Sequence, residues 1–218
     1  VMAIGRTFEE SLLKAVRSLE TGVNHLYDKK FDTYTYDELM EYIKIGTDDR
    51  LFAIAELLYH GADINMIYDN TKIDMFFLEK IKHIVDFEEE IKANVGDLPT
   101  LREAKRMGIS DKYIARLWKM SERDVYNIRK ENKLFPVYKM IDTCASEFDS
   151  YVPYFYSTYE QENESIVSDK KKIIVLGSGP IRIGQGVEFD YSTVHAIWSI
   201  RELSLIHISE PTRPLYIS

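Results

Sequence analysis

The sequence has 218 residues, of which 45% are hydrophobic and 29% charged, with a formal net charge of -8. This composition is that of an ordinary globular protein of one or two domains, and the negative charge argues against a chain whose whole surface binds nucleic acid or anionic membranes. No apolar run approaches the roughly 20 residues that a membrane-spanning helix needs. The single cysteine, Cys144, cannot form an internal disulfide, so we expect a cytoplasmic protein with no membrane partner.

The first predicted helix follows residues 2–4, which could end a strand. Thr7 and Glu10 have the spacing of a capping box, in which each side chain accepts a hydrogen bond from the backbone of the other residue. Apolar residues then recur at helical spacing: Leu12, Ala15, Val16 and Leu19. Gly22 can end this helix, because glycine suits the conformation that often follows a helix C-terminus.

From about residue 21 to residue 134 the hydrophobic pattern is helical throughout. Thr35 and Glu38 have the spacing of a second capping box. The apolar stripes of two further helices are Leu51, Ile54, Ala55 and Leu58, before Gly61, and Ile73, Phe76, Phe77, Ile81, Ile84, Phe87 and Ile91, before Gly96. Short helices separated by Gly, Asp and Pro predict a compact bundle, in which these stripes pack in the core or at an interface.

Residues 110–129 have the layout of a helix-turn-helix, with helices at 110–117 and 121–129 around a turn at 118–120. Across residues 100–133, which include Lys105 and Arg129, lysine and arginine outnumber acids, which favours a nucleic-acid-binding module as one alternative. A purely scaffolding helical module is another. Two features weaken DNA reading: Lys119 stands where such turns often have glycine, and Asp124 brings negative charge close to phosphate. We therefore expect no nucleic acid partner.

Aromatic residues crowd residues 136–159 and indicate extended segments that contact a neighbouring domain. Residues 160–171 are polar and predict a surface linker. The apolar run from Ile173 to Leu176 then predicts a buried strand, and a helix begins after the glycines that follow it. A strand, a glycine-rich turn and a helix form the ligand-binding edge of many open α/β sheets.

The glycine spacing fits neither generic nucleotide motif. Arg182 stands where the dinucleotide fingerprint needs its third glycine, and Gln185-Gly186 replace the Lys and Ser/Thr of the phosphate loop. Two interpretations stay open from the residues alone: a ligand-binding edge, or a tight turn whose glycines only permit positive φ and close packing.

Three stretches resemble, in the same order, the large subunit of the carbamoyl phosphate synthetase family. The string G-x-G-P-x-R-I-G-Q-G-x-E-F-D-Y at 177–191 resembles the opening of its second synthetase half. V-M-A-I-G-R-T-F-E-E-S-L-L-K-A at 1–15 looks like the end of its first ATP-grasp domain. P-V-Y-K-M-I-D-T-C-A-S-E-F at 136–148, with Y-S-T-Y-E at 156–160, looks like the end of its helical oligomerisation domain.

The resemblance implies a mainly α fold: a helical bundle flanked by partial α/β pieces of an ATP-grasp and a pre-ATP-grasp domain. It implies an internal fragment, with the tail of the first ATP-grasp domain at 1–20 and the oligomerisation domain at 21–162. The start of the second half then occupies 163–203. Residues 204–218 resemble translated adapter or vector sequence, and we expect them to be foreign to the fold.

The family makes carbamoyl phosphate from bicarbonate, ammonia and two ATP, for arginine or pyrimidine biosynthesis. The resemblance implies that the parent uses ATP with Mg²⁺ or Mn²⁺ and receives ammonia from a glutaminase small subunit or domain. It also implies a homo-oligomer formed through the helical domain. The family's catalytic, ATP-clamping and metal-binding residues match no position here, and the histidines show no metal-ligand spacing. We therefore expect the fragment alone to be inactive and to bind no cofactor.

The resemblance does carry a few residues onto the chain. Gly186 and Glu188 match positions near the interior passage for carbamate. A structural role in the loop falls to Gly177, Gly179, Pro180, Arg182 and Gly184. An alternative for Arg182 is a buried ion pair with Glu188.

Overall fold

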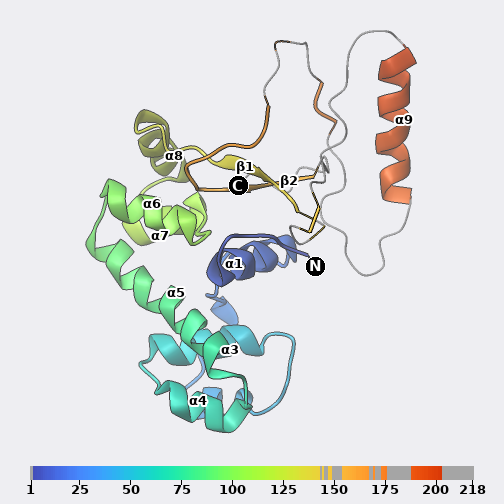
Figure 1. Ribbon diagram of the computed structural model, residues 1–218. Helices are drawn as coiled ribbons and strands as arrows, with labels where there is room; N and C mark the ends of the chain where they lie inside the picture. The colour runs from blue at the N-terminus through green and yellow to red at the C-terminus, as the bar shows by residue number, and fades with distance from the viewer. Residues whose placement is uncertain are drawn as a thin grey trace. The chain divides into compact units, whose positions relative to one another are not determined.

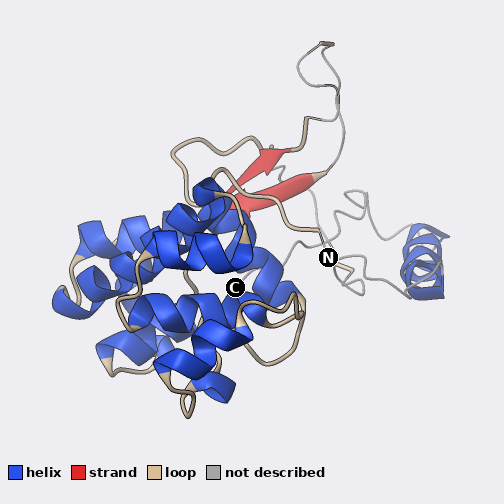
Figure 2. Ribbon diagram, turned by 90° about the horizontal axis from the view of Figure 1, so that it is seen from below, coloured by secondary structure: helices blue, strands red, loops and turns tan. Residues whose placement is uncertain are grey.

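The computed structural model describes residues 2–142, 144, 147–148, 154–166, 169, 173–175 and 188–202. The chain divides into two compact units, one formed by residues 6–134 and the other by residues 1–5 with 135–218. Helices dominate the described residues, and a single small hairpin supplies the strands (Figure 2). The predicted mainly α fold is thus confirmed.

The unit of residues 6–134, called the helical unit below, is built from short helices joined by tight turns. Its elements are α1 (Phe8–Ser18), the 3₁₀ helix η1 (Lys29–Phe31), α2 (Tyr36–Tyr42), α3 (Arg50–Tyr59), α4 (Ile64–Thr71), α5 (Met75–Ala93), α6 (Leu98–Arg106), α7 (Asp111–Trp118) and α8 (Glu122–Glu131). The longest helix, α5, packs against α1, α3, α4, α6 and α7. In Figure 1 it runs from α3 and α4 at one end to α6 and α7 at the other, so it connects the two ends of the bundle.

The predicted caps form with one exception. Thr35 and Glu38 make a complete capping box at the start of α2. At α1, the Thr7 hydroxyl accepts from the backbone of Glu10 at 3.2 Å, but the Glu10 carboxylate accepts from Arg6. Helix α1 also ends at Ser18, ahead of Gly22. Each such cap stabilises its helix by roughly 1 kcal/mol.

The predicted apolar stripes supply much of the core. In α3 the side chains of Ile54, Ala55 and Leu58 are buried as expected, and α3 is covered on its other faces too. In α5 the second half of the stripe is buried, including Ile84 and Ile91. Burying one such side chain contributes about 1.5–3 kcal/mol. The first half differs: Phe76 and Phe77 lie at the surface, outside the core.

The predicted helix-turn-helix is confirmed in layout. Ser110 caps α7 and Ser121 caps α8, where Ser121 and Asp124 form a capping box. Between them Lys119 adopts a left-handed conformation with φ of 56°. This conformation lets the backbone N–H of Met120 reach the carbonyl of Ala115 at 3.0 Å, which closes the end of α7.

The second unit contains the antiparallel strands β1 (Val137–Met140) and β2 (Phe155–Thr158), and the helix α9 (Glu188–Glu202). The extended segments predicted in this region are confirmed. Glu164, in the predicted linker, lies along the free edge of β1: its N–H donates to Tyr138 O at 2.9 Å, and its carboxylate accepts from Met140 N at 2.6 Å. These bonds satisfy backbone groups that an open strand edge leaves unpaired. No helix in the described part of the chain combines the length and the apolar character that crossing a membrane requires.

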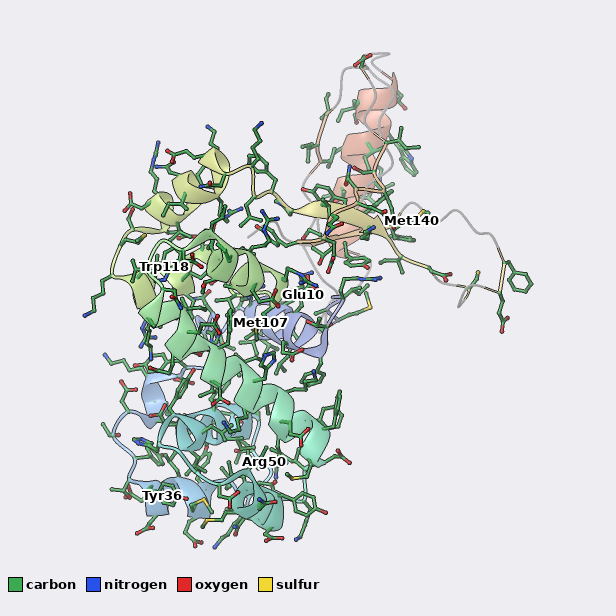
Figure 3. All side chains as sticks on the ribbon, turned by 60° about the vertical axis from the view of Figure 1, so that its left-hand side comes forward. Glu10, Tyr36, Arg50, Met107, Trp118 and Met140 are labelled. Atoms are coloured by element: carbon green, nitrogen blue, oxygen red, sulfur yellow. The ribbon has the colours of Figure 1, made fainter. Side chains whose placement is uncertain are left out.

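Gly108, in the turn between α6 and α7, allows α1 to approach this turn closely. A Cβ at this position would lie 3.0 Å from Cα of Glu10, and φ is +82°. Figure 3 shows Glu10 beside Met107, the residue before this glycine. The Gly108 carbonyl also accepts a 2.7 Å hydrogen bond from Arg17 of α1. The contact between α1 and the turn therefore depends on the missing side chain.

We predict that Gly108→Ala lowers the free energy of unfolding by about 3 kcal/mol, because strain at positive φ adds to overpacking against α1. The matched control is Gly96→Ala, where φ is +78° and nothing lies within 4 Å of the new Cβ. It should cost only the backbone strain, about 1–2 kcal/mol. Urea denaturation followed by circular dichroism measures both, and equal losses would contradict the close approach.

Candidate functional site

The residues predicted from the family resemblance fall almost wholly outside the described part of the chain. This applies to Gly177, Gly179, Pro180, Arg182, Gly184 and Gly186. Glu188 begins α9, which agrees with the helix predicted after the glycines, but its side chain is not described. The loop and the carbamate passage therefore stay predictions, and the described chemistry lies in the helical unit.

A carboxylate is buried at the centre of the helical unit. Glu88 of α5 is 1% exposed. Its carboxylate accepts hydrogen bonds from the hydroxyl of Tyr59 on α3 and from that of Tyr113 on α7, the latter at 2.8 Å. Burial raises the pKa of Glu88 to about 7, although both phenol hydrogen bonds lower it. This carboxylate thus joins three helices.

His25 lies beside this carboxylate. Its ring stacks on Tyr113 with centroids 3.8 Å apart, and its Nδ1 is 3.3 Å from Oε1 of Glu88. That separation is short enough for an ion pair, but neither ring nitrogen makes a hydrogen bond of acceptable geometry. Burial, with smaller contributions from the nearby charges of Arg17 and Arg116, lowers the pKa of His25 to about 3. The imidazole ring of His25 is therefore uncharged at neutral pH.

Sequence reasoning missed both residues. Glu88 begins a run of three acids, which usually marks a solvated helix face. One signal was present: Glu88 is four residues after Ile84 and three before Ile91, so it shares their buried face. His25 lies between α1 and η1, where no periodicity could place it.

A second buried network joins α6, α7 and α8. Asp111 accepts from Arg129 Nε at 2.9 Å and lies 2.8 Å from Lys105 Nζ. Burial alone would raise the pKa of Asp111, but Lys105 and Arg129 lower it overall. Burial lowers the pKa of Lys105 to about 8, against the attraction of Asp111. Two cations that favoured nucleic-acid binding in the sequence thus lie inside the bundle.

A group of three phenylalanines, one part-buried and two exposed, is called the aromatic cluster below and lies where α1 meets α5. Phe8, Phe76 and Phe77 contact one another with ring centroids 5.4–6.0 Å apart. The last two side chains are 50% and 43% exposed. Beside them, Glu9 accepts from Lys80 at 3.2 Å and lies 2.8 Å from His83 Nδ1. The cluster is therefore an apolar surface with a charged border.

These features suit packing and association more than chemistry. Among the described residues, no group of three or more His, Cys, Asp or Glu side chains is placed to hold a metal ion. The two buried networks lack exposure to a substrate. Among the exposed apolar side chains of the helical unit, those of the aromatic cluster contact one another, and mutually contacting aromatic rings at a surface commonly mark interfaces.

Two protein families match the chain in succession. Residues 1–133 match the family described as carbamoyl-phosphate synthetase large chain, oligomerisation domain. Residues 169–209 match the carbamoyl phosphate synthase preATP-grasp domain. The order agrees with the resemblance found in the sequence, and the first match covers the whole helical unit except its last residue. The chain belongs to the carbamoyl-phosphate synthetase large-chain family and consists of its oligomerisation domain followed by part of its preATP-grasp domain.

Proposed function

We propose that the chain is an internal part of a glutamine-dependent carbamoyl phosphate synthetase, in which it connects the two synthetase halves and promotes self-association. The observation that carries this proposal is the succession of an oligomerisation domain and a preATP-grasp domain. The parent would act in the cytoplasm on bicarbonate, ammonia and two ATP, with Mg²⁺ or Mn²⁺ neutralising the phosphoryl groups. A glutaminase small subunit or domain would supply the ammonia, for arginine or pyrimidine synthesis.

The domain boundaries are part of this proposal. We assign residues 1–20 to the end of an ATP-grasp domain and 163–203 to the start of the second half, with the oligomerisation domain between them. The family matches cover 1–133 and 169–209, so the second match includes the first residues of the segment at 204–218. The foreign origin of that segment stays a prediction.

We also propose that Gly186 and Glu188 lie near the carbamate passage of the parent. Glycines permit close backbone approach to an unstable anion, and a shielded interior protects it from water. Glu188 would repel an anion unless a cation balanced its charge. Arg182 is the candidate for that cation.

Self-association of the helical unit would use the aromatic cluster, with a second copy of the chain as its partner. The description of the matched family as an oligomerisation domain supports this assignment. Two half-exposed rings at a two-fold axis would meet their own copies, which is how symmetric dimers form self-complementary interfaces. Aromatic side chains also supply much of the binding energy at such interfaces.

We predict that replacing Phe76 and Phe77 together by serine weakens self-association by about a hundredfold, because two aromatic contacts are lost from each copy. Sedimentation velocity over a concentration series measures the dissociation constant. The matched control is Val95→Ser, which removes a 56% exposed apolar side chain from the turn between α5 and α6. Unchanged association of the double variant, or equal weakening by the control, would contradict the assignment.

The isolated chain should hydrolyse no ATP in response to bicarbonate, because the family's ATP-clamping and metal-binding residues match no position in it. A coupled phosphate-release assay with Mg²⁺, with and without bicarbonate, tests this expectation. Bicarbonate-dependent turnover that persists after repurification would overturn the assignment as an inactive part.

The helix-turn-helix layout of α7 and α8 supports the competing nucleic-acid function. Against it, Lys105 and Arg129 are engaged with Asp111 inside the bundle. We therefore expect no salt-dependent binding of duplex DNA by fluorescence anisotropy. Tight binding at physiological salt, weakening steeply as salt rises, would favour the competing function.

A further inference from the structure

The environment of Glu88 disfavours a charge on this side chain. Both hydrogen bonds to its carboxylate come from neutral phenols, those of Tyr59 and Tyr113. The positive charges of Lys92 and Arg116 act on it only as weaker influences. A buried carboxylate without a closely paired cation is far more costly to ionise than an exposed one.

The environment of His25 disfavours a charge as well. Its side chain is 1% exposed, and no acceptor meets either ring nitrogen with good geometry. The cations Arg17 of α1 and Arg116 of α7 oppose a proton on the ring. The stack on Tyr113 holds the imidazole in place next to Glu88. In the unfolded chain near pH 5.5, by contrast, both side chains carry a charge.

We propose that Glu88 and His25 form a buried proton pair: folding moves one proton from the imidazolium of His25 to the carboxylate of Glu88, and alkaline conditions remove that proton and weaken the packing of α3, α5 and α7. Protons balance in this step, since the ring loses one and the carboxylate gains one. No net exchange with solvent occurs, and the charged pair of the unfolded chain becomes a neutral pair in the core. The packing of α3, α5 and α7 around Glu88 therefore depends on pH.

The two residues have opposite effects on stability. The pKa of Glu88 rises from 4.5 to about 7 on folding, so its contribution to stability is complete below pH 4.5 and is lost as the pH rises to 7. The pKa of His25 falls from 6.5 to about 3, so its contribution is absent below pH 3 and complete above pH 6.5. Between pH 4.5 and 6.5 the stability contribution of Glu88 falls with pH as that of His25 rises. The two changes cancel, so the stability of the native protein shows neither titration.

Substituting one residue of the pair ends this cancellation and makes the pH dependence of stability measurable. In Glu88→Gln the amide replaces the protonated carboxyl and still accepts from a phenol. The ratio of its folding equilibrium constant to that of the native chain should rise about tenfold per pH unit between pH 4.5 and 7, and level off above that range. In His25→Phe, which keeps a ring for stacking, the corresponding ratio should fall about tenfold per pH unit between pH 3 and 6.5.

Urea denaturation of the 218-residue chain over this pH range measures both ratios. The matched control, Glu90→Gln, removes an exposed acid of α5, and its ratio should change less than that of Glu88→Gln. A ratio for Glu88→Gln that is flat from pH 4.5 to 7 overturns the proposal. If a variant fails to fold, carbon-13 spectra of glutamate carboxyl groups in the native chain decide the question. One carboxyl titrating near pH 7 supports the proposal, and titration of all of them near their ordinary pKa refutes it.

Discussion

Glu88 is buried where α3, α5 and α7 meet, and the packing of the helical unit depends on how its carboxylate is satisfied. The hydroxyls of Tyr59 on α3 and Tyr113 on α7 both donate to it, while His25 lies beside it in the chain between α1 and η1. A polar group in this position is tolerated only with its partners in place, since an unsatisfied buried acceptor costs about 1–3 kcal/mol. The phenols therefore fix the positions of α3 and α7 on α5.

At the other end of the bundle, a second buried carboxylate is satisfied by different partners. Asp111 is satisfied by Lys105 and Arg129, so α6, α7 and α8 are held by charges instead of phenols. Such buried ion pairs add little net stability, but losing one member leaves an uncompensated charge inside. With these polar groups turned inward, the aromatic cluster of Phe8, Phe76 and Phe77 stands out at the surface. This arrangement fits a domain whose role in its synthetase is to associate.

Local chemistry made much of the fold predictable from the sequence. The cap at Thr35 and the turn at Lys119 depend on nearby residues, and both were predicted from the local sequence pattern. Tertiary contacts were not predictable in this way. The same residue types that cover a solvated face, acids and lysines, supply Glu88 and Lys105 to the core. The first half of the α5 stripe lies outside the core, because periodicity alone does not tell whether an apolar face packs in the core or meets a partner.

Native-state hydrogen exchange tests most directly whether the helical unit is one cooperative structure organised around Glu88. Amides of α3, α5 and α7 that flank the carboxylate should exchange only through global unfolding, with the same free energy and the same dependence on denaturant. The shared value should be the highest in the helical unit. Exchange of α3 through a local opening, with a clearly lower free energy than α7, would contradict the account, because the Tyr59 contact would then not couple the two ends of the bundle.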